Sequence, residues 1–313
     1  MSSTLNWRKT RSLRIRLGLA VRRPSCGRLA RACGLAVQTA LLVVLGACVS
    51  PPLSGPAIEA RLQVLLPANA ILLGEQHDNP DHQRIQQVVV QALAARGQLV
   101  AVAMEMAERP FTTALLAPTA TEADVKTALR WDDKAWPWQP YAPVVMAAVR
   151  AGVLVLGANL PRAQMRVVMG DTRLDTGLDA AAMSAQNQAI RKGHCDALPE
   201  SQIMPMTRIQ IARDKAMADS LAQAVATKQG KTVLLIAGSA HVDALVGVAR
   251  HLPPGFTYRS VLLAATELDA EAGTEAGTES QASRIQATPG FDAVWPTLAA
   301  PETDYCADFK ARR

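Results

Sequence analysis

The sequence predicts an α/β fold, in which a mostly parallel sheet is flanked by helices in three layers and a helical subdomain is inserted over the strand ends. Short apolar runs of strand length alternate with stretches of helical periodicity, an order that is typical of parallel sheets. Hydrophobic residues make up 49% of the 313 residues and aromatic residues only 4%. This composition suits an aliphatic core in one large domain or two small ones.

The first strand–helix–strand unit begins at residue 70. The apolar run 70–73 is predicted to be a buried strand, and Gly74 allows the backbone to turn at its end. A helix is expected over about 80–96, with Asn79 as its N-cap and a proline in its first turn. Residues 99–104 form a second buried strand, so the unit is expected to be a right-handed parallel crossover.

The next part of the chain leads to a third strand. Helical character is expected over 109–130, with a break at Pro118, followed by a loop over 131–141, a short helix over 142–151 and a strand over 153–156. The loop holds three of the chain's five tryptophans. Such a cluster can pack in a core or an interface, or it can form one wall of a cofactor site, and the sequence leaves both open.

A region without strand signals, residues 162–229, predicts the helical subdomain. It is expected to break around 193–199 and to end in a helix over about 206–228. The remaining predicted elements are a strand over 231–238, a helix that ends at His251, a strand over 258–265 and an edge strand within 288–297.

The two ends of the chain are expected to lie outside this domain of residues 70–265. Residues 1–47 carry nine basic and no acidic residues and end in an apolar stretch, which is typical of a signal peptide and too short to span a membrane comfortably. Leu45-Gly46-Ala47-Cys48 resembles a bacterial lipobox, so we expect Cys48 to be lipidated and to anchor the chain. A buried apolar helix that ends in a chance cysteine is the alternative.

Two further segments have distinctive compositions. Residues 48–69 are expected to be a tether that leads into the first strand, and residues 266–284 an acidic low-complexity linker. Residues 285–313 then form a C-terminal edge segment and tail. Val49 stands where an aspartate would retain a lipoprotein in the inner membrane, which favours the outer membrane, facing the periplasm.

The net charge of +6 comes from the leader. Residues 48–313 hold 24 basic and 27 acidic residues, so the charge gives no indication of a nucleic-acid partner. Two cysteines, Cys195 and Cys306, remain beyond the leader and Cys48. They either form a disulfide, as an oxidising compartment allows, or stay as two free or buried thiols.

Polar side chains follow four of the predicted strands. Parallel strands deliver their carboxyl ends to one edge of a sheet, where ligand crevices of open α/β sheets lie. We therefore expect these side chains to converge there: Glu75, His77, Glu105, Asn159, Arg162 and His241.

This convergence has three possible meanings. Glu75, His77, Glu105 and His241 have the side chains of a divalent metal site, and the same groups could serve as general acid–base pairs. The third reading is structural, with helix caps and satisfied hydrogen bonds. No phosphate loop, dinucleotide-binding glycine pattern or nucleophile elbow accompanies them.

The order of these motifs resembles the ChaN family of haem-binding lipoproteins, within the larger haem-uptake/Tiki group. The sequence departs from the family at Ala240, where a glycine is expected, and at Asp243-Ala244-Leu245, where the family tends to be basic. The matching motifs cover roughly 70–265 and are Gly74-Glu75-Gln76-His77-Asp78-Asn79-Pro80-Asp81-His82, Val102-Ala103-Met104-Glu105-Met106, Tyr141-Ala142-Pro143, Asn159-Leu160-Pro161-Arg162, His194-Cys195-Asp196-Ala197-Leu198-Pro199, Arg213-Asp214-Lys215-Ala216-Met217 and Ile236-Ala237-Gly238-Ser239-Ala240-His241-Val242.

The resemblance implies haem as the ligand, a homodimer that holds haem between its protomers and an outer-membrane receptor as a further partner. Tyrosine can ligate haem iron, and Tyr141 beside the tryptophan loop is the candidate. The full set of residues expected at the haem site is Glu75, His77, Asp78, Glu105, Tyr141, Asn159, Arg162, Arg213, Asp214 and His241.

Two other functions compete with haem binding. Related Tiki-like proteins resemble metalloproteases, which implies a metal-dependent hydrolase in which Glu75, His77 and His241 act on a metal-activated water. An inert envelope scaffold, with a purely structural polar cluster, is the other.

Overall fold

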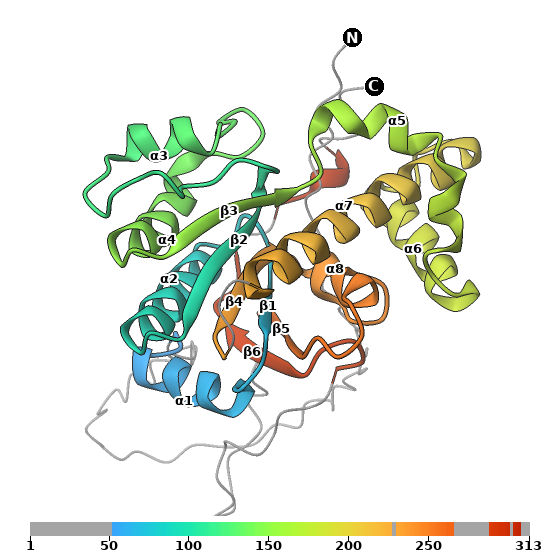
Figure 1. Ribbon diagram of the computed structural model, residues 1–313. Coiled ribbons are helices and arrows are strands. Elements are labelled where there is room, and N and C mark those ends of the chain that lie inside the picture. Colours follow the sequence, from blue (N-terminus) through green and yellow to red (C-terminus); the bar gives the residue numbers. More distant parts are fainter. Residues whose placement is uncertain (1–51, 227–229, 266–287, 301–302, 308–313) are drawn as a thin grey trace, which may run out of the picture. The chain divides into compact units, whose positions relative to one another are not determined.

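The computed structural model of the chain describes residues 52–226, 230–265, 288–300 and 303–307 (Figure 1). The predicted signal peptide (1–47), the predicted lipidation site Cys48 and the predicted acidic linker (266–284) lie outside these ranges. Among the described residues, no helix has both the length and the apolar character that crossing a bilayer requires.

A six-stranded sheet forms the centre of the fold, with the strand order β3-β2-β4-β1-β5-β6. Every neighbouring pair of strands is parallel, which confirms the predicted α/β class. The strands are β1 (Ala70–Glu75), β2 (Leu99–Glu108), β3 (Leu154–Asn159), β4 (Thr232–Gly238), β5 (Tyr258–Ala265) and β6 (Ala293–Thr297).

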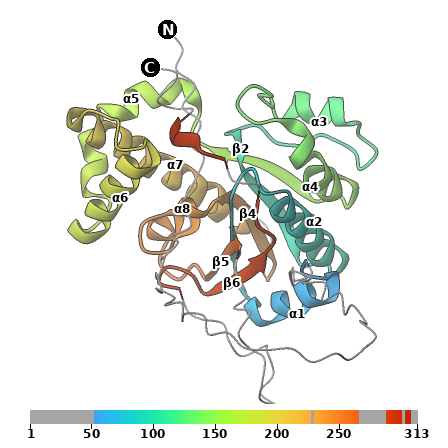
Figure 2. The ribbon, with the colours of Figure 1, turned by 180° about the vertical axis from the view of Figure 1, so that it is seen from behind.

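Helices cover both faces of the sheet, as Figures 1 and 2 show from opposite sides. Helices α1 (Gly55–Leu65), α2 (Pro80–Ala95) and α4 (Trp138–Arg150) pack on one face, and α7 (Glu200–Ala226) packs on the other. Successive side chains of a strand point to opposite faces, so Leu73 of β1 contacts the first group of helices and Leu72 packs on the side of α7. Both faces of the sheet are therefore buried, as a parallel sheet requires.

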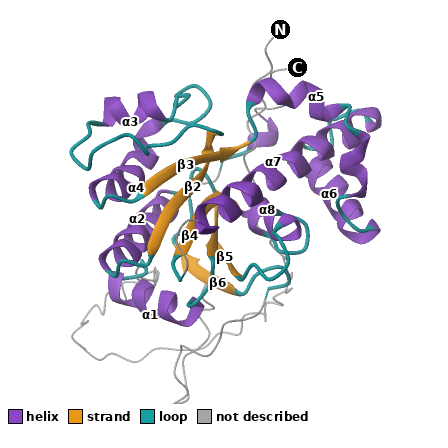
Figure 3. Cartoon of the chain, in the orientation of Figure 1, coloured by secondary structure: helices purple, strands orange, loops and turns teal. Residues whose placement is uncertain are grey.

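The remaining helices are short or belong to the helical subdomain, which lies beside the sheet (Figure 3). Asn79 caps α2 by accepting a hydrogen bond from the Asp81 amide at 3.0 Å, as its position before Pro80 predicts. Beside α1, α2, α4 and α7, the described helices are α3 (Glu122–Ala128), α5 (Met165–Met169), α6 (Ala180–Gly193) and α8 (Ser239–Val242). The 3₁₀ turns are η1 (Arg162–Gln164), η2 (Thr172–Thr176) and η3 (Val248–His251).

The structure corrects several predicted elements. The segment 109–121 is not helical, because it lies along the edge of β3: the Thr113 amide donates to the Val155 carbonyl at 3.0 Å, and Thr112 bridges to Leu156. The predicted helix that ends at His251 is instead the short α8 and the turn η3.

The predicted tether over 48–69 contains a helix, α1, that was not predicted from the sequence. Ser54 caps α1, and Ile58, Leu62 and Leu65 of this helix are buried against the sheet layer. Their spacing of four and three residues is the helical signal that identifies such a segment.

The helical subdomain breaks where the sequence predicts, between α6 and α7. Cys195 and Asp196 in this break have positive φ angles of 59° and 53°. Cys195 forms a disulfide with Cys306, with their Cα atoms 5.5 Å apart. Of the two alternatives that the sequence left open, the structure has the disulfide, and the bridge ties the C-terminal segment to the helical subdomain.

Candidate functional site

The carboxyl ends of the strands carry a buried network of polar side chains. Glu75 ends β1, Glu105 lies in β2 and Asn159 ends β3, and all three side chains are buried. Because β2, β4 and β1 are neighbours in the sheet, the predicted convergence of Glu75, Glu105 and His241 takes place. The strand-end network is defined here as these residues with His77, Tyr141, Arg213 and Asp214.

One arm of the strand-end network centres on Glu75. Its carboxylate accepts a hydrogen bond from the Tyr141 hydroxyl at 2.7 Å and lies 2.6 Å from Nδ1 of His77. Its second oxygen accepts from the amides of Gln83 and Gln86 in α2. Every lone-pair direction of this buried carboxylate thus faces a donor, as a buried charge requires.

Glu105 stands at the centre of the strand-end network. Its carboxylate accepts from Nη2 of Arg213 at 2.5 Å and from the backbone amide of Gly238 at 2.8 Å. It also lies 3.3 Å from Nε2 of His241 and 3.6 Å from Nε2 of His77. This single carboxylate therefore connects both histidines.

The second arm comes from α7. Arg213 and Asp214 are buried in this helix; Nε of Arg213 donates to Asn159 at 2.9 Å, and Asp214 lies 2.5 Å from Nδ1 of His241. The amide of Gln210, one helical turn earlier, contacts the same ring nitrogen at 2.9 Å. Residues three and four apart share one face of a helix, which brings these side chains together.

The charges of the strand-end network shift its pKa values. Burial lowers the pKa of His241, but the charges of Glu105 and Asp214 and its hydrogen bonds to them outweigh burial and raise the value to about 9. Burial raises the pKa of Asp214, and His241 offsets only part of that increase. The buried His241–Asp214 pair therefore holds a proton at neutral pH.

The pKa values of the two glutamates, Glu75 and Glu105, are both lowered. Burial favours a raised pKa at Glu105, but the charges of His241, Arg213 and His77 hold the pKa well below its usual range. At Glu75 burial acts in the same way, and the hydrogen bond and charge of His77, with Gln86 and Tyr141, lower the pKa. Both carboxylates are ionised at neutral pH.

Gly238 is required by the packing of the strand-end network. A Cβ atom at this position would lie 2.9 Å from Nε2 of His77 and 3.6 Å from Oε2 of Glu105. The absence of a side chain lets the Gly238 amide approach Glu105 and leaves room for the imidazole.

Two predicted site residues lie outside the strand-end network. The Arg162 side chain is half-exposed and pairs with Asp132 of the tryptophan loop at 3.1 Å. Asp78 accepts hydrogen bonds from Gln76 and from the hydroxyl of Tyr305. Both residues therefore belong to the outer surface of the strand-end edge, and their predicted role at a haem site stays a prediction.

Three glutamines that contact members of the strand-end network were missed by sequence reasoning: Gln83, Gln86 and Gln210. All three are buried, and each lies on a helix face that also carries buried apolar residues. Gln83 and Gln86 are one turn apart in α2, which is the signal that could have identified them.

The neighbouring motif residues Asn79, Asp81 and His82 hold the edge strand. His82 accepts from the Gln76 amide at 2.9 Å through Nδ1 and lies 2.9 Å from the Thr297 hydroxyl through Nε2. Asn79 and Asp81 bond the backbone of Leu298 at 2.8 and 3.0 Å. Because a backbone N–H donates to Nδ1, the neutral tautomer is fixed, and burial lowers the pKa of His82 to about 4.

The predicted metal site receives no support. Within the described parts of the chain, no group of three or more His, Cys, Asp or Glu side chains is arranged to hold a metal ion. The oxygens of Glu105 that would face a metal accept from Arg213 and Gly238 instead. The predicted metal-dependent hydrolase used Glu75, His77, Glu105 and His241 as ligands, and the structure gives this ligand set no support.

The histidines and the tyrosine of the strand-end network do not form an open haem pocket. His77, His241 and Tyr141 are 9%, 2% and 2% exposed, and their polar atoms face partners inside the network. The imidazole of His77 and the ring of Trp136 pack edge to face, with the ring centroids 4.7 Å apart. Trp136 is half-buried and marks where the network approaches the surface.

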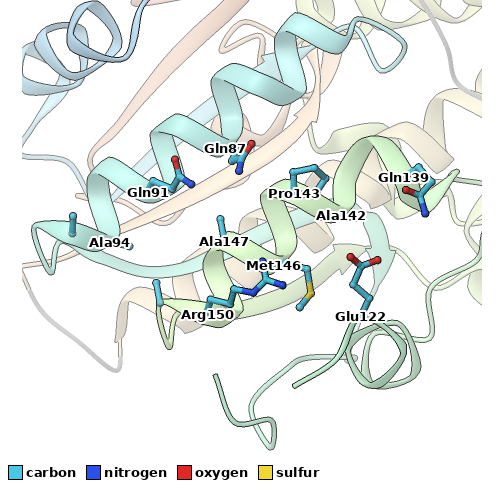
Figure 4. Close-up of a pocket in the computed structure, with 12 residues that line it drawn as sticks. Gln87, Gln91, Ala94, Glu122, Gln139, Ala142, Pro143, Met146, Ala147 and Arg150 are labelled. Atoms are coloured by element: carbon cyan, nitrogen blue, oxygen red, sulfur yellow. The ribbon is translucent and has the colours of Figure 1, made fainter. Parts of the chain in front are cut away.

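A groove lies elsewhere, between α2 and α4 (Figure 4). Its volume is about 810 Å³, and its lining includes Gln87, Gln91, Met146 and Arg150 but no member of the strand-end network. A neighbouring groove of about 310 Å³ reaches the partners of the network only at Gln83. Neither groove leads to the two histidines.

Solved structures resemble this chain over about two thirds of its length. A ChaN from Campylobacter jejuni, in a structure described as cofacial haem binding, is 26% identical, with a TM-score of 0.57 over 67% of this chain and 87% of that chain. A mutant of the erythromycin esterase EreC in its open conformation is 14% identical, covers 67% of this chain and 73% of its own, and has a TM-score of 0.42, which carries no functional argument. No curated protein matches the chain.

A family model matches a continuous part of the chain that contains every member of the strand-end network. Its description is haem-binding uptake, Tiki superfamily, ChaN, and the match covers residues 62–252. This range is more than half of the chain and includes the strands β1 to β4 that carry the network. The chain therefore belongs to the ChaN family of haem-binding uptake proteins, within the Tiki superfamily.

Proposed function

We propose that this protein is a haem-binding lipoprotein of the cell envelope that acts in haem or iron acquisition. The family match over residues 62–252 is the observation that carries the proposal. The similarity to the Campylobacter ChaN, whose description names cofacial haem binding, supports the same ligand. A homodimer around haem and an outer-membrane receptor remain predictions that rest on the family resemblance alone.

The anchor is proposed from the sequence. The basic leader, its apolar stretch and Leu45-Gly46-Ala47-Cys48 are the features of a lipoprotein signal, and acyl chains on Cys48 would hold the protein on a membrane. Val49 favours the outer membrane, with the protein facing the periplasm. Metabolic labelling with a fatty acid, in the full chain and in Cys48→Ala, tests this: label in the full chain alone supports the anchor, and equal label in both contradicts it.

We place haem at the outer surface of the strand-end edge, beside Trp136 and His77. The buried members of the strand-end network are held by one another, so their role in this proposal is to fix His77 in place. Trp136 supplies a half-buried aromatic surface next to that imidazole. When bound, haem itself would supply the iron chemistry.

Haem titration tests the function. The chain from Val49 onward, which contains every described residue, is expected to shift the Soret band of haemin and to saturate at a fixed stoichiometry. Trp136→Ala is expected to weaken binding by tenfold or more. Val64→Ala removes an exposed apolar side chain on α1 and should leave binding unchanged. A folded protein that produces no Soret shift would refute haem binding, and equal affinities for both variants would refute this placement.

A further inference from the structure

A short C-terminal segment lies across the strand-end edge. Residues 303–307, called the C-terminal strap below, are drawn in red above the ends of the strands in Figures 1 and 2. The chain enters this region from β6, where Leu298 is held by Asn79 and Asp81 at the start of α2. The strap therefore belongs to the edge that carries the strand-end network.

The C-terminal strap contacts the loop after β1 and the helical subdomain. The hydroxyl of Tyr305 donates to the carboxylate of Asp78, in the loop after β1. Cys306 is bonded to Cys195, in the break of the helical subdomain. The Asp304 side chain accepts from the amides of Cys306 and Ala307 at 3.0 Å each, which holds the strap in a compact turn. One contact is reversible and non-covalent, and the other is covalent.

The C-terminal strap contacts the residue that follows His77 in the chain. Asp78 directly follows His77, and His77 keeps 9% of its surface exposed. Trp136 covers the same imidazole from the tryptophan loop. The tryptophan loop thus contacts His77, and the strap contacts Asp78, the next residue in the chain.

We propose that the C-terminal strap is a disulfide-locked cover that limits access to His77 and opens when the Cys195–Cys306 bond is reduced. This rests on the proposed function only in that the ligand admitted would be haem. The bridge joins cysteines 111 residues apart in the chain, so without it the strap is held to the helical subdomain by no covalent bond. The Tyr305–Asp78 hydrogen bond is a non-covalent contact that reduction leaves in place.

The reductant is a dithiol, of the class that reduces disulfides by exchange. One of its thiolates attacks a sulfur of the Cys195–Cys306 bridge and displaces the other sulfur as a thiolate, and its second thiol then closes the dithiol's own disulfide. Two electrons pass from the dithiol to the bridge, and the two protons of the dithiol end on Cys195 and Cys306. Both cysteines are half-exposed, so a dithiol can reach them.

Chemical modification of histidine measures the cover directly. Oxidised protein, protein reduced with dithiothreitol and the double variant C195S/C306S are treated with diethyl pyrocarbonate, and each histidine is followed by mass spectrometry. The rate at His77 is expected to rise at least threefold in the reduced protein and in the double variant. His82 is fully buried and held by Thr297, so it is the internal control and should not change. Equal rates at His77 in oxidised and reduced protein would overturn the proposal.

Tyr305→Phe is the second variant, for the case in which loss of the disulfide loosens the whole fold. This variant retains the bridge and removes only the hydroxyl that contacts Asp78, so His77 should react faster than in the native protein and slower than after reduction. An unchanged rate at His77, together with a faster rate at His82 after reduction, would overturn the proposal.

The rate of haem association distinguishes the disulfide-locked cover from the proposed haem-binding function. If both hold, haem associates faster with the reduced protein in the same proportion as His77 gains reactivity. If the protein binds no haem while His77 still becomes accessible on reduction, the cover stands and only the proposed function fails.

Discussion

Arg213 of α7 donates a hydrogen bond to Glu105 of β2 at 2.5 Å, although 108 residues separate the two in the sequence. Both side chains are buried. The pair joins the helical layer to the sheet at the strand ends, and His77 and His241 both lie against the same carboxylate. Loss of either partner would leave an uncompensated charge in the protein interior.

Arg213→Ala is therefore expected to lower the free energy of unfolding by about 3–5 kcal/mol, as breaking a buried ion pair does. Urea unfolding measures the change. The control is Arg162→Ala, because the Arg162–Asp132 pair is half-exposed and such pairs contribute only about 0–1 kcal/mol. Similar losses of unfolding free energy in the two variants would contradict a stabilising role of the Arg213–Glu105 pair between α7 and the sheet.

The raised pKa of His241 makes stability depend on pH. The unfolded imidazole has an ordinary pKa near 6.5 and the folded one a pKa of about 9, so the folded state binds the proton more tightly. The stabilisation is fully present below pH 6.5 and is lost as the pH rises to 9, by an amount on the order of 3 kcal/mol. Urea unfolding at pH 6, 7.5 and 9 should show this decline. His241→Gln should flatten it, and an undiminished slope in the variant would assign the decline to other groups.

Gly238→Ala tests the packing around His77. The new Cβ would lie 2.9 Å from Nε2 of this imidazole, so the ring must move, and overpacking of this kind costs about 1–3 kcal/mol of stability. Haem binding should weaken in parallel. Gly55→Ala is the matched control, because its Cβ would meet nothing within 4 Å and alanine favours the helix that begins there. A variant at Gly238 as stable as the native protein would contradict the close approach.

Tyr141→Phe separates a buried hydrogen-bond donor from an iron ligand. The Tyr141 hydroxyl donates to ionised Glu75 at 2.7 Å, so its removal is expected to cost about 1.5–3 kcal/mol of stability. The Soret spectrum of the haem complex should stay unchanged. Tyr258→Phe changes a half-buried phenol at the opposite end of the sheet and should alter neither property. Loss of the Soret shift at full stability would restore Tyr141 as the ligand.

The sequence by itself determined the elements whose signals are local. The run before Gly74, the cap at Asn79 and the alternation of apolar runs with helical segments predicted the parallel sheet. They also placed Glu75, Glu105 and His241 at one edge, because parallel strands all end on the same side. The prediction of helix was wrong over residues 109–121, because backbone groups of this segment pair with the edge of β3. No local sequence pattern reveals that partner.

Only the tertiary structure decided which polar groups meet. Arg162 and Arg213 were both predicted at the site, yet the first pairs with Asp132 at the surface and the second with buried Glu105. Gln83, Gln86 and Gln210 joined the strand-end network through helix faces that pack on the sheet. Strand ends are fixed by the topology of the chain, whereas hydrogen bonds of a few ångströms depend on how α2 and α7 pack against those ends. That packing arises from contacts between residues far apart in the sequence.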